Sequence, residues 1–276
     1  MNKKILLIND FSGYGKVAVS AMTPVLVHRG FELFSLPTMI VSNTLNYGKF
    51  ATIDTTSYMK EAVLVWNELG FKFDAVSTGF IANDEQAEFI AGLCRSESEK
   101  GVKIFVDPIM ADNGKLYNSV SMHRVEIMKE LASVADYIVP NQTEACLLSG
   151  LSYKESGYEL SEINEMLHAI HKLGAKSVII TGAFIKSENG EIKKAVACYD
   201  HLNDECFTVF FDEIPVKVNG TGDTFSAIMI AELMCGSSLK DAVTKATESV
   251  RELIVRNLDI IGEYNGLPIE KDLDIL

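Results

Sequence analysis

Long hydrophobic runs are missing from this chain of 276 residues. Its longest apolar stretches, such as residues 228–233, fall far short of the roughly 20 residues that span a bilayer, and Glu232 interrupts that one. Near the N-terminus, residues 5–8 are apolar, but this run is shorter than the core of a signal peptide, and Asn9 and Asp10 end it. We therefore expect a cytoplasmic protein without a membrane partner.

Positive charge is also scarce. Lysine and arginine number 25 against 38 aspartate and glutamate residues, so the formal net charge is −13. Nucleic acids and anionic membranes bind to basic patches, and we expect neither as a partner. A nucleotide is not excluded, because backbone N–H groups, a helix N-terminus and a metal ion can hold phosphates without a basic surface.

Cysteine is present but forms no recognisable pattern. There are five cysteines, an odd number, and no pair has Cys-x-x-Cys spacing. This argues against a disulfide framework and against a structural zinc site. His168 and His171 lie three residues apart within a predicted helix. A zinc site would need further ligands, so we interpret them as helix surface residues.

No internal repeat, low-complexity tract or linker interrupts the chain, which predicts a single domain over residues 1–276. Strand-like apolar runs alternate with helix-like segments. This alternation predicts an α/β fold with a mostly parallel central sheet and helices on both faces. The expected strands are residues 4–8, 33–41, 75–78, 102–106, 137–139 and 177–180, and the expected helices are residues 17–28, 58–69, 85–94, 125–132 and 159–173, with two more that begin near residues 222 and 239.

The alternation changes after residue 180. Two apolar runs, residues 195–199 and 206–211, are separated by a polar turn at residues 200–205. This pattern predicts an antiparallel hairpin at the edge of the sheet.

Open parallel sheets bind ligands at the carboxyl ends of their strands. Polar residues and glycines follow six of the predicted strands, at residues 9–15, 42–44, 78–80, 107–108, 140–144 and 181–182. We expect these segments to converge on one crevice. That arrangement favours an enzyme over an interaction module, although a fold alone does not name a reaction.

The most informative segment is residues 219–227, which read Asn-Gly-Thr-Gly-Asp-Thr-Phe-Ser-Ala. Two glycines allow a tight turn, and the apolar pattern that follows predicts a helix directly after it. Backbone donors at a helix N-terminus form an anion site. A carboxylate beside a phosphate would repel it, so Asp223 is expected either to accept a proton from an attacking alcohol or to cap the helix.

This segment resembles the Gly-x-Gly-Asp motif of the ribokinase-like superfamily, in which the glycines form an anion hole and the aspartate is the catalytic base. Within that superfamily the chain is similar to the pyridoxal (vitamin B6) kinases over nearly its whole length. The matching segments are residues 42–50 (family Ser-Asn-His-Thr-x-Tyr), 78–80 (Thr-Gly-Tyr), 107–110 (Asp-Pro-Val-Met) and 135–150 (Ala-Asp-x-x-x-Pro-Asn-x-x-Glu). The resemblance implies a three-layer ribokinase-like fold and a homodimer.

It also implies an activity. The γ-phosphate of ATP would pass, with Mg²⁺, to the 5′-hydroxymethyl group of pyridoxal, pyridoxamine or pyridoxine and give the 5′-phosphate. Asp223 would take the proton of that hydroxyl, and Gly220, Thr221 and Gly222 would hold the transferring phosphoryl group.

Five further residues are implied on the nucleotide side. Asn141 and Glu144 would organise Mg²⁺ and the phosphates through water, although the same spacing is that of a helix N-cap and its capping-box partner. Asp107, Thr181 and Gly182 would lie along the triphosphate, and Asp107 can also be read as a residue that forms a turn at a strand end.

A monovalent cation, K⁺ or Na⁺, is implied at Asp112. The threonine that accompanies this position in the family is Val139 here, so the chain keeps only part of that site.

The implied substrate pocket contains Asp10, Ser12, Thr44, Leu45, Tyr47 and Phe80. It departs from the family at three places. The first strand ends in Asn-Asp-Phe instead of Gln-Ser-His, Thr44 and Leu45 replace a His-Thr pair, and Phe80 replaces a tyrosine.

Residues 10–15, Asp-Phe-Ser-Gly-Tyr-Gly, resemble instead a loop of the hydroxymethylpyrimidine kinases, the thiamine-pathway branch of the superfamily. That branch carries cysteine at the position of Asp223, and residues 47–50 favour the B6 branch. Phosphorylation of hydroxymethylpyrimidine is therefore the alternative activity. A non-catalytic B6-binding protein is a further alternative, against which the intact Asp223 and its glycines argue.

Asp10 stands where the family has a neutral serine that faces the substrate ring. A carboxylate only accepts hydrogen bonds, which would favour the cationic aminomethyl group of pyridoxamine over the aldehyde of pyridoxal. Alternatively, Asp10 turns back toward residues 12–15 and accepts hydrogen bonds from their backbone amides.

Overall fold

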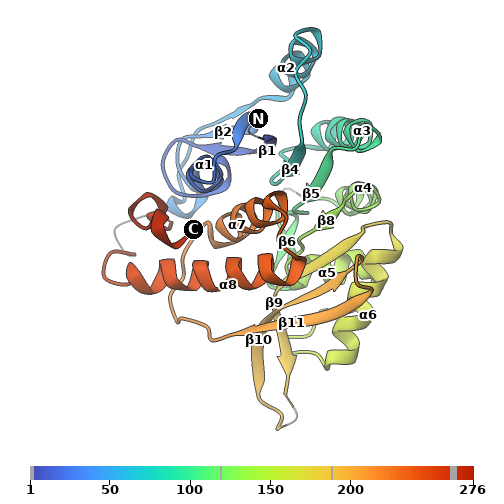
Figure 1. Ribbon diagram of the computed structural model, residues 1–276, viewed down its shortest axis with the longest axis vertical. Coiled ribbons are helices and arrows are strands. Elements are labelled where there is room, and N and C mark those ends of the chain that lie inside the picture. Colours follow the sequence, from blue (N-terminus) through green and yellow to red (C-terminus); the bar gives the residue numbers. More distant parts are fainter. Residues whose placement is uncertain (1–2, 119, 188, 262–265) are drawn as a thin grey trace. The chain divides into compact units, whose positions relative to one another are not determined.

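The computed structural model describes residues 3–118, 120–187, 189–261 and 266–276 (Figure 1). The chain groups into two compact units. The terminal unit comprises Met1–Ala82 and Ile214–Leu276, and the middle unit comprises Asn83–Glu213. The single domain expected over residues 1–276 stays a prediction.

The terminal unit contains four strands in the order β4-β1-β2-β3. β1 (Lys4–Ser12) pairs in parallel with β2 (Glu32–Val41) on one side and with β4 (Ala75–Thr78) on the other. Residues 5–8 of β1 are fully buried, which explains why this strand is continuously apolar rather than alternating. β3 (Thr52–Asp54) is antiparallel to β2, and the sequence did not predict it because all three of its residues are exposed.

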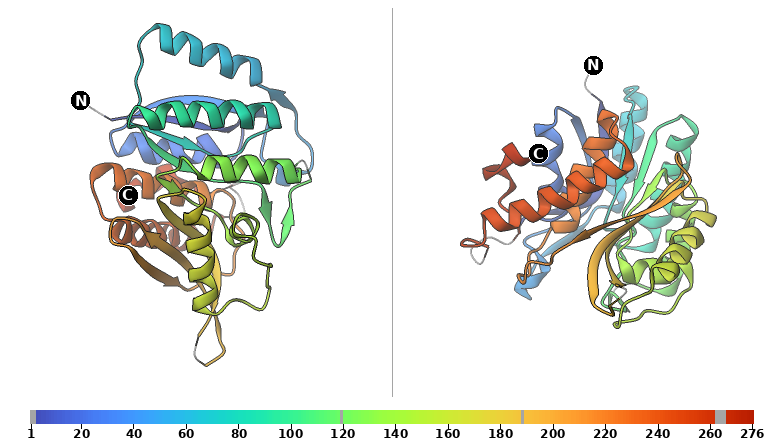
Figure 2. Two further views of the ribbon diagram at one scale, coloured as in Figure 1. Left: turned by 90° about the vertical axis from the view of Figure 1, so that its right-hand side faces the viewer. Right: turned by 60° about the horizontal axis from the view of Figure 1, so that its bottom comes forward.

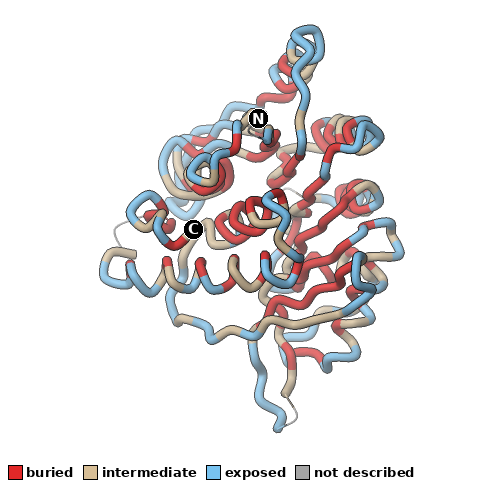
Figure 3. The backbone as a smooth tube through the Cα atoms, viewed as in Figure 1, coloured by how far each residue is buried: buried red, intermediate tan, exposed pale blue. Residues whose placement is uncertain are grey.

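Four helices accompany these strands in the described part of the unit: α1 (Ala18–His28), α2 (Thr56–Glu68), α7 (Thr221–Cys235) and α8 (Leu239–Arg256). α7 contacts both α1 and α8, and Figure 2 shows the orange helices of residues 221–256 near the blue helix of residues 18–28. Figure 3 shows α7 mostly buried, whereas α8 alternates between buried and exposed positions. α7 is therefore largely buried and mostly apolar apart from residues such as Asp223 and Glu232, while α8 has one apolar stripe.

Three short 3₁₀ helices complete the described part of the terminal unit. η1 (Leu45–Tyr47) follows β2, and η2 (Ile269–Lys271) and η3 (Leu273–Ile275) lie near the C-terminus. η2 contacts α1, and η3 contacts α8.

The middle unit contains five strands in the order β11-β10-β9-β8-β5. β5 (Lys103–Val106), β8 (Tyr137–Ile138) and β9 (Ser177–Lys186) are parallel. β10 (Ile192–Asp200) and β11 (Glu205–Phe211) then run antiparallel at the end of this order, which confirms the predicted hairpin (Figure 1). A two-residue hairpin, β6 (Ala111–Asp112) with β7 (Lys115–Leu116), was not predicted.

The helices of the middle unit are α3 (Asp84–Glu99), α4 (Met122–Ala132), α5 (Gln142–Ser149) and α6 (Leu160–Lys172). Together the described strands and helices confirm the predicted class, a mixed α/β fold whose strands are mostly parallel. None of the described helices is long and apolar enough to cross a membrane.

β1 and β9 both continue beyond their predicted ends, and β1 extends from residue 8 to Ser12. β9 was expected to end at residue 180 but continues to Lys186. Gly182 has a φ of +62°, and the register between β9 and β10 shifts beside it, between Ala195 and Ala197. A glycine in this left-handed conformation forms a β-bulge, so a residue that resembled a strand end is a bend within the strand.

Candidate active site

The N-terminus of α7 carries backbone amides without a cap from the side chain of its N-cap residue. Its N-cap, Gly220, has a φ of +76°, and a Cβ at this position would lie 1.9 Å from the carbonyl oxygen of Lys16. Glycine is therefore required both for the backbone conformation and for the close approach of the residue 16 backbone. No side chain caps the helix, so amides of its first turn can bind an anion.

Asp223 lies in this first turn and is half-buried. The Asn9 amide nitrogen is 3.4 Å from its Oδ1. Burial raises the pKa of the Asp223 carboxyl group, while hydrogen bonds from the Ala18 backbone amide and from Asn9 oppose this shift because they stabilise the charged form. The backbone amide of Asp223 itself is a third donor, and the half-buried carboxylate stays close enough to the surface to receive a proton.

The backbone at Ala18 is strained. Ala18 is the first residue of α1 and has a φ of +50°, in the left-handed region that non-glycine residues rarely occupy. This conformation costs about 1–2 kcal/mol. It directs the Ala18 amide toward Asp223, so the strain contributes a donor to the candidate base.

Asp10, at the same end of β1, has an unusual pKa. Burial and, secondly, the negative charge of Asp223 raise it to about 7. A carboxyl group with such a pKa changes its charge within the physiological range. The two carboxyl groups are therefore electrostatically coupled neighbours.

The predicted substrate segment around η1 lies near the same loop. Asn46 donates a hydrogen bond of 2.9 Å to the side-chain oxygen of Asn219. Asn219 directly precedes residues 220–223, which we call the anion loop. Leu45 and Tyr47 are exposed, and the Tyr47 ring lies 6.1 Å from that of Tyr14. An open pocket of about 750 Å³ is lined by Tyr14, Ser42, Asn43, Tyr47, Lys49, Phe50 and Ala51.

Three further predicted pocket residues have mixed environments. The Thr44 hydroxyl is buried and, among the described residues, has no hydrogen-bond partner. The Ser12 hydroxyl donates to the Tyr14 carbonyl oxygen at 2.6 Å, which gives it a structural role in the turn. Phe80 is half-buried, and its backbone amide donates to the Asn9 side chain at 2.8 Å.

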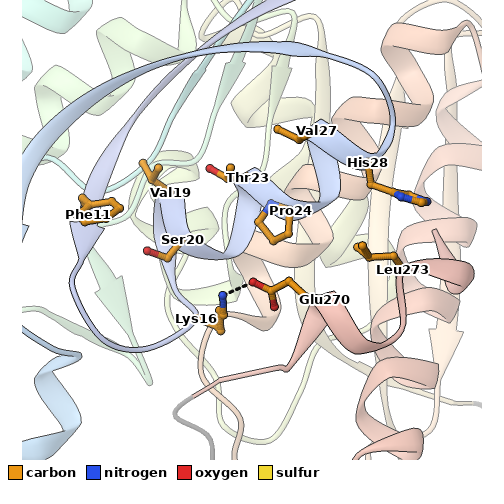
Figure 4. A pocket seen from close by; sticks show the side chains of 10 residues that line it. All are labelled: Phe11, Lys16, Val19, Ser20, Thr23, Pro24, Val27, His28, Glu270 and Leu273. Carbon is orange, nitrogen blue, oxygen red and sulfur yellow. Dashed lines mark hydrogen bonds and ion pairs between the residues drawn. The ribbon is translucent and has the colours of Figure 1, made fainter.

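A second pocket of the terminal unit, about 500 Å³ in volume, lies between α1 and the C-terminal 3₁₀ helices (Figure 4). Its labelled side chains include Lys16 and Glu270, which form an ion pair. None of the predicted site residues lines this pocket. The carbonyl group of the same Lys16 is the one that approaches Gly220 closely.

In the middle unit, Asn141 and Glu144 form the capping box of α5. The Asn141 side chain accepts hydrogen bonds from the amides of Thr143 and Glu144, and Glu144 Oε2 accepts one of 2.8 Å from the Asn141 amide. Glu144 Oε1 accepts another from the Met110 amide at 3.0 Å. Glu144 is buried, and burial raises the pKa of its carboxyl group to about 8.

The charges of three predicted acidic residues affect the pKa of one phenol. The pKa of Tyr117 is raised to about 12 by burial and then by the charges of Glu144, Asp112 and Asp107. Asp112 is exposed and accepts hydrogen bonds from the backbone and side chain of Asn113. Among the described residues, no group of three or more His, Cys, Asp or Glu side chains is arranged to hold a metal ion.

Thr181 and Gly182 lie beside the capping box. The Thr181 amide donates to the Pro140 carbonyl oxygen at 2.9 Å, and Thr181 forms an isolated parallel bridge with Asn141. The structure thus brings the predicted residues together in two groups, Asp10 to Phe80 with the Gly220 to Asp223 loop in the terminal unit, and Asp107 to Gly182 in the middle unit.

Two site residues were not assigned from the sequence. Asn9 was counted among the polar strand-end residues, but the substrate-binding role was assigned to its neighbour Asp10. Ala18 gave no signal, because alanine rarely adopts a positive φ and its residue type does not predict one. Only the position of Asn9 directly after a buried apolar run could have pointed to it.

Comparison with known proteins identifies the family. The family model for phosphomethylpyrimidine kinase matches residues 26–267. A pyridoxine kinase of Bacillus subtilis is 32% identical over 95% of this chain and 94% of its own length. A hydroxymethylpyrimidine/phosphomethylpyrimidine kinase of Haemophilus influenzae is 26% identical over 96% of this chain and 95% of its own length.

A solved structure is similar throughout. It comes from Bacteroides thetaiotaomicron, is described as a phosphomethylpyrimidine kinase in an orthorhombic form with pyridoxal, and has 31% identity and a TM-score of 0.91. The match covers 99% of this chain and 95% of that one. It confirms the ribokinase-like fold class. The chain belongs to the phosphomethylpyrimidine kinase family and, within it, is a kinase of the pyridoxal kinase group.

Proposed function

We propose that this kinase transfers the γ-phosphate of ATP to the 5′-hydroxymethyl group of a B6 vitamer, with Asp223 as the general base. The hydroxyl proton passes to the Asp223 carboxylate as the hydroxyl oxygen attacks the γ-phosphorus, and ADP leaves. The observation that carries the proposal is the half-buried carboxylate of Asp223 in the uncapped first turn of α7.

Two features of the terminal unit support this assignment. Amides of the first turn of α7 have no side-chain cap, so they can stabilise the charge of the transferring phosphoryl group. At Gly222 an added Cβ would meet no protein atom within 4 Å, which leaves room for phosphate oxygens. Hydrogen bonds from Ala18 and Asn9 favour the ionised form of Asp223 that a base requires.

For the nucleotide we propose Asp107, Asn141, Glu144, Thr181 and Gly182 of the middle unit. The side-chain oxygens of Asn141 and Glu144 already accept backbone hydrogen bonds, so these residues fit Mg²⁺ held through water and not by direct contact. Bound Mg²⁺ would neutralise phosphate charge, with Asp107 and Asp112 as nearby carboxylates. Asp112 also stays our proposal for a K⁺ or Na⁺ site.

B6 vitamers are supported as substrates by two relatives, one a pyridoxine kinase and the other a structure with pyridoxal. The second candidate is hydroxymethylpyrimidine, because a relative named for that activity aligns with nearly the whole chain. The aspartate at position 223, where the resemblance implies cysteine for the thiamine branch, favours the B6 vitamers. We also propose a homodimer, by resemblance to the family.

The test is a coupled ADP-release assay with pyridoxal, pyridoxamine, pyridoxine and hydroxymethylpyrimidine. We expect turnover with the vitamers. Replacement of the base, Asp223→Asn, should lower kcat by about 10²–10⁴ while nucleotide binding survives, because the amide cannot accept the proton.

The matched control is Asp241→Asn, which alters the acidic residue in the first turn of α8. It should leave kcat unchanged. Turnover of Asp223→Asn within about threefold of the parent would reduce Asp223 to a helix-cap residue and overturn the mechanism. A parent that prefers hydroxymethylpyrimidine would overturn the B6 assignment, and one that turns over none of the four would indicate a binding protein.

A further inference from the structure

Asn9 is a buried polar residue next to the proposed base. It lies in β1 with only 3% of its surface exposed. The ladder between β1 and β4 ends at the pair Ile8 and Thr78, so Asn9 is the first residue beyond it. There its side chain replaces a backbone acceptor, because Oδ1 accepts a hydrogen bond from the Phe80 amide at 2.8 Å.

The hydrogen bonds fix which way the Asn9 amide points. Oδ1 also accepts a bond of 3.0 Å from the Asp10 amide. A flipped side chain would turn its NH₂ group toward two N–H donors and its oxygen toward a carboxylate, and both contacts would be repulsive. The Nδ2 group is therefore held toward Asp223 Oδ1, at 3.4 Å.

A neighbouring glycine makes room for this amide. A Cβ at Gly79 would lie 2.3 Å from the Asn9 side-chain carbon Cγ and also 2.3 Å from Nδ2. Gly79 has no positive φ, so steric room rather than backbone conformation requires the glycine. The glycine at position 79 thus leaves space for the Asn9 side chain in the orientation described above.

We propose that Asn9 is a positioning residue that orients the Asp223 carboxylate and stabilises its charged form. The inference rests on the proposed function, since it gives Asn9 a role only through the base. The present distance of 3.4 Å is long for a hydrogen bond, and such contacts often shorten when a substrate binds.

Other groups near Asp223 must be considered in a test based on pH. From β1 the titratable neighbour is Asp10, whose own pKa responds to Asp223. From α1 the group that faces Asp223 is the Ala18 amide, and from α7 it is the backbone amide of Asp223 itself. Because the charge of Asp223 raises the pKa of Asp10, the test includes a background without the Asp10 carboxyl group.

The first variant is Asn9→Asp. It has nearly the same shape and keeps an acceptor for the Phe80 and Asp10 amides, but it replaces the donor with a negative charge. A like charge at this distance raises the pKa of a carboxyl group. We expect the acidic limb of the kcat/KM profile to move upward by about one pH unit or more, in the parent and in the Asp10→Asn background.

The second variant is Gly79→Ala, which touches neither carboxyl group but displaces the Asn9 amide. The acidic limb should move in the same direction. The control is Thr38→Val, because the Thr38 hydroxyl donates to the Phe80 carbonyl oxygen at 2.8 Å and so supports the same loop without contacting Asp223. It should lower the melting temperature and leave the limb in place.

A second readout does not depend on turnover. Titration of the Asp223 carboxyl carbon by ¹³C NMR in the ligand-free protein should give a higher pKa in Asn9→Asp and Gly79→Ala than in the parent and Thr38→Val. If the parent phosphorylates no vitamer, the proposed function fails, and this titration still decides the role of Asn9. An unchanged Asp223 pKa in both variants, or an equal shift in Thr38→Val, would overturn the inference. If Asn9→Asp does not fold, Asn9→Ser takes its place.

Discussion

Two carboxyl groups, those of Asp10 and Asp223, lie next to each other at the end of β1 and the start of α7. Their environments differ. Asp223 receives hydrogen bonds from Asn9 and Ala18, whereas Asp10 is buried beside the charge of Asp223 and has a pKa near 7. Such an arrangement separates the environments of the two acids, because hydrogen bonds favour the charged form of Asp223 while Asp10 changes its charge near neutral pH.

This difference leads to a prediction about substrate choice. If the Asp10 carboxylate faces the ring substituent, pyridoxamine should be used about ten- to a hundredfold better than pyridoxal, since charge-assisted hydrogen bonds contribute about 1.5–3 kcal/mol. The carboxylate forms as the pH rises through about 7, so the preference should be larger at pH 8 than at pH 6. Specificity constants for both vitamers at the two pH values provide the measurement.

Asp10→Ser should narrow this preference and remove its pH dependence. The matched control is Asp74→Ser, which removes a carboxylate at the opposite end of β1, where it accepts a hydrogen bond from the Lys4 amide. Equal pyridoxamine-to-pyridoxal ratios in the parent and in Asp10→Ser would exclude recognition of the substituent by Asp10.

At this scale, the sequence identified Asp223 and Asp10 because both lie in motifs of glycine and acidic residues. It could not assign Asn9 or Ala18. The direction of the Asn9 amide depends on the Phe80 backbone, 71 residues further along the chain, and the positive φ of Ala18 is one that alanine rarely adopts. Both properties arise from tertiary structure, which no local pattern encodes.

At the scale of the elements, the geometry at the start of α5 is compatible with two roles for Asn141 and Glu144, a structural one and a functional one. Asn141 and Glu144 form a complete capping box, which stabilises the helix, and Glu144 also lies among the carboxylates around Tyr117. The buried position of Glu144 suits a residue that fixes neighbouring backbone amides, such as those of Met110 and Asn141, by hydrogen bonds.

Glu144→Gln separates these two roles. We expect the Mg²⁺ concentration needed for half-maximal turnover to rise by more than nucleotide affinity falls, because the metal acts on the phosphates during transfer. The matched control is Glu162→Gln, at the same capping-box position of α6. Because glutamine also serves as a capping-box partner, Glu162→Gln should leave the melting temperature and the Mg²⁺ requirement nearly unchanged. An unchanged requirement in Glu144→Gln would leave Glu144 as a capping residue alone.

The long elements were predictable and the short ones were not. The predicted core of each long helix lies within or close to an observed helix, because apolar periodicity over three or more turns is a strong signal. β3, β6 and β7 have only two or three residues each, too few for a period to show. The prediction ended β9 too early because, in the sequence, a glycine in a β-bulge looks like the end of a strand.

At the scale of the whole molecule, the pattern of apolar residues predicted the fold class, and the resemblance to known motifs predicted the family. The alternation of strand and helix predicted the mostly parallel α/β fold, which the structure confirms. The grouping of the chain into two units, the second inserted between the two parts of the first, could not be seen in the sequence because no linker of distinctive composition marks it.

The net charge of −13 leads to a prediction about partners. At low ionic strength, where electrostatic attraction is strongest, the protein should show no binding to a labelled DNA duplex or to vesicles of anionic lipid. Fluorescence anisotropy and vesicle sedimentation provide the measurements. Binding that weakens steeply with added salt would reveal a basic patch that the total charge conceals.

The antiparallel hairpin of the middle unit has a consequence for handling the protein. β11 pairs with β10 on one side, and among the described residues no strand pairs with its other side. Residues 206–211, Cys-Phe-Thr-Val-Phe-Phe, have high β-propensity, no charge and no proline. Such an edge is a template for intermolecular strand addition. Mutual repulsion between acidic chains opposes this aggregation at neutral pH and fades as the solution approaches the isoelectric point near 4.9.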